Sequence, residues 1–349
     1  MHIVSSRLVF ASAVMALTTL AGCPKGKLPG GSGIPGGSGI PGGGVPGGLG
    51  GESGMVDPNS CGNYAVSDAG RKLKDFLIAT QQLQTTTENT VKVVRESCII
   101  LGTEIGMVEA DLQGETKDVC AKVYGQVDAN MKVAVKSKAA LKVKYTPAVC
   151  KVNVEAEAKA AAECEGKASA DIKASCSGTC SGTCEGTCAG KAGTGGSGGQ
   201  CNGQCQGTCR GECDGHADVN ASAQCKASAS VKASADVQCT EPSLDISLDA
   251  KLVVDKAKAE QTIKGLKAGL PKIFSVKARL ASLEYAAKLW ASSAAELKDS
   301  AGTLATSFKD QAMCITGQIG AAAKMMGSIQ ANVSVSVEVS ASASGSIGG

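Results

Sequence analysis

Cysteine is the residue type with the greatest chemical capacity in this 349-residue chain, which holds 17 cysteines and only two histidines. Thiols can form disulfides, bind soft metals or act as nucleophiles. Histidine catalysis and multi-histidine metal sites need more imidazole groups, because His2 lies in a segment that we expect to be removed and His216 then stands alone. The sequence therefore predicts a non-enzymatic protein with no catalytic residues, no cofactor and no metal site.

The cysteines between residues 141 and 250 show a mirror pattern. Two tracts carry the repeat C-x-G-x on either side of a Gly-rich segment that is typical of a loop. If the chain turns back there, every cysteine of one arm faces a cysteine of the other across one axis, and Pro147 faces Pro242. We predict six disulfides in this register: Cys188–Cys201, Cys184–Cys205, Cys180–Cys209, Cys176–Cys213, Cys164–Cys225 and Cys150–Cys239.

The side chains of both arms alternate between small or apolar residues and polar residues. This period of two is typical of a strand, so we predict one long β-hairpin over 131–255 with its tip near 189–200. The Ala, Glu and Lys content around 155–163 favours a helix instead. We nevertheless predict a strand there, because a helix would scatter the alternating residues around every face. The resulting face of Ala, Gly and Cys is flat, so it could self-associate or dock on an envelope protein, or be covered by the same chain.

The segments that flank the arms have helical periodicity. Residues 56–130 and 256–330 place apolar side chains at three-and-four spacing, and Pro271 is expected to separate two helices. Residues 331–349 alternate again and predict a strand-like tail. The expected fold is α+β: an antiparallel helical bundle with a projecting, disulfide-laddered hairpin and a disordered N-terminal linker. We expect one link from Cys314 to the N-terminal helices, and the pairing of Cys61, Cys98, Cys120 and Cys314 stays open.

The N-terminus carries an export signal. Arg7 precedes a short apolar run that ends in Leu-Ala-Gly-Cys at residues 20–23. This resembles the lipobox of bacterial lipoproteins, and the resemblance covers residues 1–23 alone. It implies that residues 1–22 are removed, that Cys23 is lipidated, with palmitate among its acyl chains, and that the chain is anchored in the cell envelope. Pro24 follows the cysteine, and the absence of Asp there favours the outer membrane.

Residues 23–55 repeat Pro-Gly-Gly and predict a disordered linker between the lipid anchor and the folded part. Export places the cysteines outside the cytoplasm, where disulfides persist. Removing Cys23 from the count leaves an even number of cysteines, as complete pairing requires.

The charge of the chain excludes one class of partner. With 35 basic and 32 acidic residues there is no basic field for nucleic acid. We expect a lipid-anchored, extracytoplasmic envelope protein with a structural or adhesive role, whose partners are the membrane and either another copy or an envelope protein. The alternative is a cysteine-rich protein that sequesters metal or buffers thiol redox state, which would require free thiols.

Overall fold

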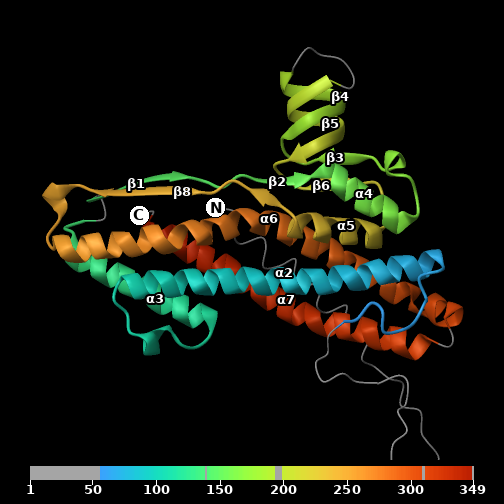
Figure 1. The fold of residues 1–349 in the computed structure, drawn as a ribbon, viewed down its shortest axis with the longest axis horizontal. Helices are drawn as coiled ribbons and strands as arrows, with labels where there is room; N and C mark the ends of the chain where they lie inside the picture. Colours follow the sequence, from blue (N-terminus) through green and yellow to red (C-terminus); the bar gives the residue numbers. More distant parts are fainter. Residues whose placement is uncertain (1–55, 138–139, 193–198, 309–310, 348–349) are drawn as a thin grey trace, which may run out of the picture.

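A helical bundle forms the body of the molecule. The computed structural model describes residues 56–137, 140–192, 199–308 and 311–347. The long helices are α2 (Asp68–Glu104), α3 (Thr116–Ala134), α6 (Lys256–Ser307) and α7 (Ala312–Ile347). Helix α6 runs antiparallel to α2 and α7, and a coiled pair of strands stands upright from the elongated bundle (Figure 1). The α+β fold class expected from the sequence is confirmed.

The bundle core is built around the single tryptophan. Trp290 of α6 is fully buried and stacks on Phe76 of α2, with ring centroids 5.5 Å apart. Its indole Nε1–H donates to the Thr80 hydroxyl at 2.7 Å, so the polar end of the ring is satisfied inside the core. Within the described residues, no helix is both long enough and apolar enough to cross a membrane.

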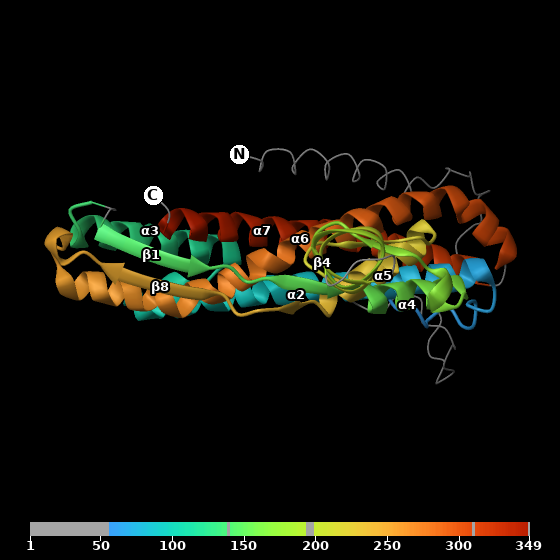
Figure 2. The same cartoon turned by 90° about the horizontal axis from the view of Figure 1, so that it is seen from above.

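A two-stranded ribbon lies along the bundle (Figure 2). Its strands, β1 (Leu141–Thr146) and β8 (Ser243–Leu248), pair in the predicted register, with Val143 opposite Ile246. The ribbon covers α6, where Tyr145 contacts Phe274 with ring centroids 4.7 Å apart. The sequence mirror therefore predicted the correct pairing for this part of the arms.

The arms do not continue as one hairpin, and this part of the prediction over 131–255 is wrong. Each arm contains an α-helix between short strands. The elements are β2 (Cys150–Asn153), α4 (Val154–Glu165), β3 (Ala174–Cys176), β4 (Cys180–Ala192), β5 (Gly199–Cys213), β6 (Ala217–Val219), α5 (Ala223–Ala235) and β7 (Gln238–Cys239).

Local helix signals outweigh the alternation in the first arm. The Asn153 side chain caps α4 by accepting the backbone N–H of Ala156, and Gly166 ends the helix with a φ of 68°. Alanine has the highest helix propensity, and its small side chain lets α4 and α5 pack closely against each other. Lys226 of α5 forms an ion pair with Asp218 of β6.

The predicted strand at 331–349 is also wrong, because its described residues belong to α7. The buried residues repeat at helical spacing and include Val333, Ser336 and Ala343. The Ser336 hydroxyl donates to the carbonyl of Asn332 at 2.9 Å, so a serine can lie on the buried face. Pro271 does not separate two helices either. Helix α6 continues through it, with Leu270 and Ile273 buried on either side.

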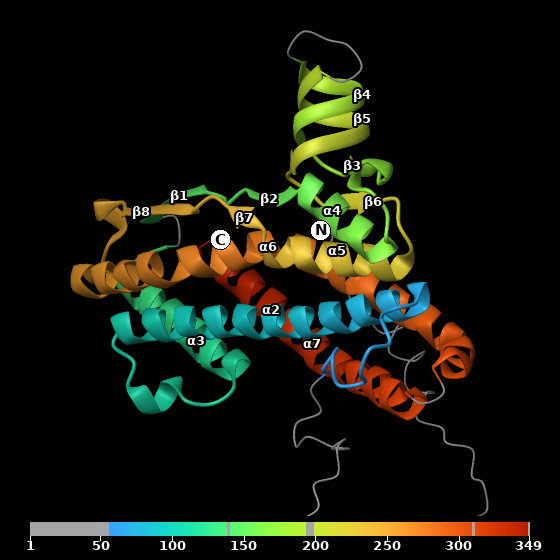
Figure 3. The ribbon, with the colours of Figure 1, turned by 45° about the vertical axis from the view of Figure 1, so that its right-hand side comes forward.

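A second, smaller core lies where the arms leave the bundle. It joins small apolar residues of α4, β3 and β6 to the cysteines of β4 and β5. Helix α5 connects this unit to the bundle, because its Ala227 and Val231 are buried in the bundle core while its Ala229 belongs to the smaller core. The arms are therefore held on the bundle by helix α5 as well as by the β1–β8 ribbon (Figure 3).

Candidate functional site: a disulfide-bonded coil

The upright element is a hairpin that closes on itself. Strand β4 pairs with β5 as a hairpin, in which Cys188 lies opposite Cys205 and Cys184 opposite Cys209. The start of β4 also pairs along its other edge with the start of β5, where Gly182 lies opposite Cys201. Because β4 hydrogen-bonds on both edges, the two-stranded ribbon winds into a narrow coil (Figure 3).

The disulfides cross the inside of this coil. Cys184 bonds to Cys205 and not to Cys209, its Cα partner in the hairpin, so the sulfur pairing is offset by four residues from the backbone register. The prediction that bonded cysteines lie directly opposite one another is therefore wrong in the coil, although the same cysteines are bonded. A coil brings inward-facing residues of different rungs together, which a flat ribbon cannot do.

The structure contains the six disulfides expected from the mirror axis. Three lie inside the coil: Cys180–Cys209, Cys184–Cys205 and Cys188–Cys201. Cys176–Cys213 closes the base of the coil. Cys164–Cys225 joins α4 to α5, and Cys150–Cys239 joins β2 to β7.

Glycine is required at the positions between the cysteines. Inward-facing glycines lie opposite one another, as Gly186 and Gly207 do. A Cβ atom on Gly186 would lie 2.1 Å from the carbonyl oxygen of Gln206, and Gly186 has a φ of 157°. The C-x-G-x repeat thus specifies an inner face on which a disulfide alternates with a position that has no room for a side chain.

The outer face of the coil is polar. Outward positions of β4 and β5 carry Ser, Thr, Glu, Gln, Asn and Arg, and Arg210 pairs with Glu185 at 2.7 Å between Nε and Oε1. The Cys and Gly part of the face that we expected either to dock on a partner or to be covered by the same chain is the inside of the coil. A partner of this element would therefore meet polar side chains and exposed strand edges.

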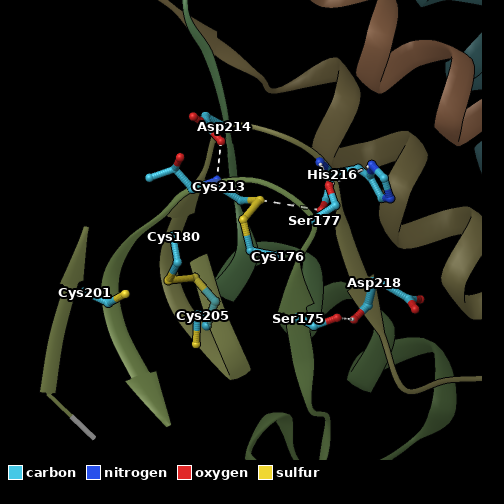
Figure 4. Close-up of a disulfide and its surroundings, with 12 residues drawn as sticks. Ser175, Cys176, Ser177, Cys180, Cys201, Cys205, Cys213, Asp214, His216 and Asp218 are labelled. Atoms are coloured by element: carbon cyan, nitrogen blue, oxygen red, sulfur yellow. Dashed lines mark hydrogen bonds between the residues drawn. A yellow bond between two sulfur atoms is a disulfide. The ribbon is translucent and has the colours of Figure 1, made fainter. Parts of the chain in front are cut away.

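A cluster of titratable residues lies at the base of the coil. His216 stacks on Tyr285 of α6, with ring centroids 3.8 Å apart. The Ser177 hydroxyl accepts the backbone N–H of His216 and lies 3.0 Å from its Nδ1 (Figure 4). Burial lowers the pKa of His216, which favours the neutral imidazole.

The buried member of this cluster is Glu157 of α4. Only 2% of the residue is exposed, and its Oε1 has no hydrogen-bond partner. Burial, with a smaller contribution from the nearby carboxylate of Asp218, raises its pKa to about 8. The same surroundings raise the pKa of Tyr285 to about 12, with burial as the main cause. Glu157 is therefore a carboxyl that the fold holds in its neutral form near pH 7.

The remaining described cysteines tie the bundle together. Cys61, just before α2, bonds to Cys314 in α7, in line with the expected link from Cys314 to the N-terminal part. Cys98 bonds to Cys120 between α2 and α3, a pair that no pattern in the sequence indicated. The predicted lipidation site, Cys23, lies outside the described residues. Every cysteine within the described ranges is disulfide-bonded, and those ranges hold no cluster of metal-ligating side chains.

Comparisons with protein-family models, with curated proteins and with solved structures find no match to this chain.

Proposed function

We propose that this chain is a non-enzymatic, lipid-anchored protein of the bacterial cell envelope, and that its coil is a rigid contact element with a structural or adhesive role. The observation that carries the proposal is the construction of the coil. Disulfides and glycines line the interior of its described part, and its polar exterior stands clear of the bundle. Such an element is built to keep its shape.

The position of the N-terminal end supports outward presentation. Val56 is buried, and the backbone N–H of Asp57 donates to Gln318 of α7 at 2.8 Å. The first described residues therefore lie on the α7 side of the bundle, away from the coil (Figures 1 and 3). A lipid anchor at Cys23 would then hold the bundle by the linker 23–55 and leave the coil facing away from the membrane.

The anchor is tested in cells that express the full chain. Cys23→Ala should abolish incorporation of labelled palmitate and move the protein from the membrane fraction to the soluble fraction. Cys61→Ala with Cys314→Ala is the matched control, because it removes cysteines without touching the anchor. Membrane attachment of the Cys23→Ala protein would overturn the lipoprotein assignment.

The role of the coil is tested by removing it. Deleting residues 178–212 and joining the ends with two glycines keeps Cys176 and Cys213 close enough to bond. We expect this protein to stay membrane-bound and folded while the cells show the same loss of envelope integrity or surface adhesion as cells without the protein. Thr208→Ser serves as the unperturbed control. Wild-type behaviour of the deletion strain, or free thiols in the mature protein, would favour the alternative of metal or thiol chemistry.

A further inference from the structure

One disulfide differs from the others in its exposure. Cys150–Cys239 joins β2 to β7, and it is the one disulfide of the described chain in which neither cysteine is buried. The other seven each have at least one buried cysteine. A thiolate must reach a sulfur atom along the sulfur–sulfur axis, so exposure is the first requirement for exchange.

A hollow of about 220 Å³ lies against this disulfide. Cys150 lines it, together with Val149 on the same strand, Asp214 and Gly215 at the base of the coil, and Ala281 and Ser282 of α6. A single water needs roughly 10–15 Å³ by a comparable measure, so the hollow can hold a small organic molecule. Cys239 is not among its lining residues, and an incoming group would therefore meet Cys150 first.

We propose that Cys150–Cys239 is a reactive disulfide that exchanges with small thiols bound in this hollow. The thiolate sulfur attacks Sγ of Cys150, the protein disulfide breaks, a mixed disulfide forms at Cys150, and Cys239 leaves as a thiolate. A second thiol then attacks the sulfur of the bound molecule and releases it as a symmetric disulfide. The two thiols are oxidised by two electrons, and the protein pair is reduced to two thiols.

The consequence of exchange is local. Cys150 and Cys239 form one of only two residue pairs between β2 and β7, and the adjacent rung is a pair of 2.9 Å hydrogen bonds between Val149 and Thr240. Opening the disulfide removes the covalent link between the arms at the point where the β1–β8 ribbon gives way to the unit that carries the coil. Further along the arms toward the coil, Cys164–Cys225 and Cys176–Cys213 keep the two arms covalently joined.

The charge at the hollow selects among thiols. Asp214, whose carboxylate accepts the backbone N–H of Thr179, is one of the residues that line it. The negative charge of Asp214 repels an anionic thiol and attracts a cationic one.

The two thiols to compare are cysteamine, which is cationic, and 2-mercaptoethanesulfonate, which is anionic. The rate of each with Cys150–Cys239 is divided by its rate with a small model disulfide, which corrects for intrinsic reactivity. We expect the corrected rate to be at least threefold higher for cysteamine. Asp214→Asn keeps an acceptor for Thr179 and should abolish the difference, and a difference that survives would overturn the proposed entry route.

The main test follows each disulfide of the mature protein in time. The protein is exposed to cysteamine, trapped with iodoacetamide and analysed by mass spectrometry. Cys150–Cys239 should react at least tenfold faster than Cys176–Cys213, with the first adduct on Cys150. Earlier reaction of any other pair, or a first adduct on Cys239, would overturn the proposal.

A variant that fills the hollow separates binding from simple exposure. Ala281 is an exposed wall residue on α6, and Ala281→Phe should slow reaction at Cys150–Cys239 about tenfold while Cys61–Cys314 reacts at its original rate. Ala268→Phe, at another exposed position of α6 outside the lining, is the matched control. Melting temperatures of both variants check that the fold is retained. Equal rates in the two variants would show that the hollow takes no part.

Discussion

At the scale of single residues, the coil depends on the alternation of two residue types, cysteine and glycine, on its inner face. Cysteine fills the inside by bonding across it, and glycine leaves room where backbones approach. A Cβ atom on Gly207 would lie 2.2 Å from the carbonyl oxygen of Glu185, which no rotamer change can relieve because the contact is with backbone. Substitutions on this face should therefore be costly, and substitutions on the outer face should be tolerated.

Gly186→Ala tests the inner face. The added methyl group would overlap the carbonyl oxygen of Gln206 and adopt a φ that favours glycine, at a cost of about 3 kcal/mol. We expect the yield of correctly bonded protein after oxidative refolding, measured by non-reducing mass spectrometry, to fall several-fold. Thr187→Ala, on the exposed side of the same strand, should refold as well as the original protein. Equal yields for both variants would contradict a closed coil.

Glu157 makes stability depend on pH in an unusual direction. Its pKa is about 8 in the folded protein and 4.5 in the unfolded chain, so the folded state retains a proton that the unfolded state loses. The stabilisation is complete below pH 4.5, declines as the pH rises and is lost above about 8. The free energy of unfolding should fall by up to about 1.4 kcal/mol per pH unit in this window.

Glu157→Gln removes this dependence because the amide does not titrate. Urea unfolding from pH 5 to 8 should therefore give a flatter profile for this variant than for the original protein. Glu163→Gln, on the exposed side of the same helix, should leave the slope unchanged. A slope that persists in Glu157→Gln would assign the titration to another group.

At the scale of elements, the two arms show how helix and strand signals compete. Alternating Ala and charged residues fit a half-buried strand, but they also fit a helix that packs against another Ala-rich helix. Caps decide the outcome in α4, where Asn153 and Gly166 supply the start and the end. Cys164–Cys225 then joins α4 to α5, a link that would have served equally well between two strands.

The disulfides of the bundle and of the coil should contribute to different transitions. Cys98–Cys120 closes a loop with a sequence separation of 22, so replacing both residues by Ala should destabilise the bundle by about 3 kcal/mol. The same replacement at Cys188 and Cys201, near the end of the coil, should leave the melting temperature of the bundle unchanged, as followed by near-ultraviolet circular dichroism of Trp290. A large shift with the second pair would mean that coil and bundle unfold as one unit.

At the scale of the whole molecule, a compact bundle carries an element that shares little of its core. Helix α5 and the ribbon connect the two parts, and the coil stands upright above them (Figure 1). Such a division is consistent with the proposed role of the coil as a rigid contact surface held away from a lipid anchor. It also explains how a chain with only 3% aromatic residues forms a stable projection, since disulfides replace the large apolar side chains that it lacks.

A disulfide map of the mature protein checks the architecture as a whole. We expect Cys188–Cys201 and Cys184–Cys205 in the coil, and no free thiol among the cysteines from Cys61 onward. The alternative set Cys188–Cys205 and Cys184–Cys209 would join the backbone partners of the hairpin directly. Detecting that set would contradict the closed coil and favour a flat ribbon in the backbone register.

The sequence by itself determined which cysteines of the arms pair and how β1 meets β8, because a mirror pattern has one axis and outlying pairs such as Cys150–Cys239 test it. Helical flanks also followed from apolar spacing. The tertiary structure decided that the Ala-rich stretch of the second arm and the Val-rich tail are helices, because an alternating pattern fits both a half-buried strand and a helix that packs on another helix. Of the two arm helices, only α4 has local caps that favour the helix by themselves. The tertiary structure alone decided the coil, since closure depends on contacts between rungs that are distant along the ribbon.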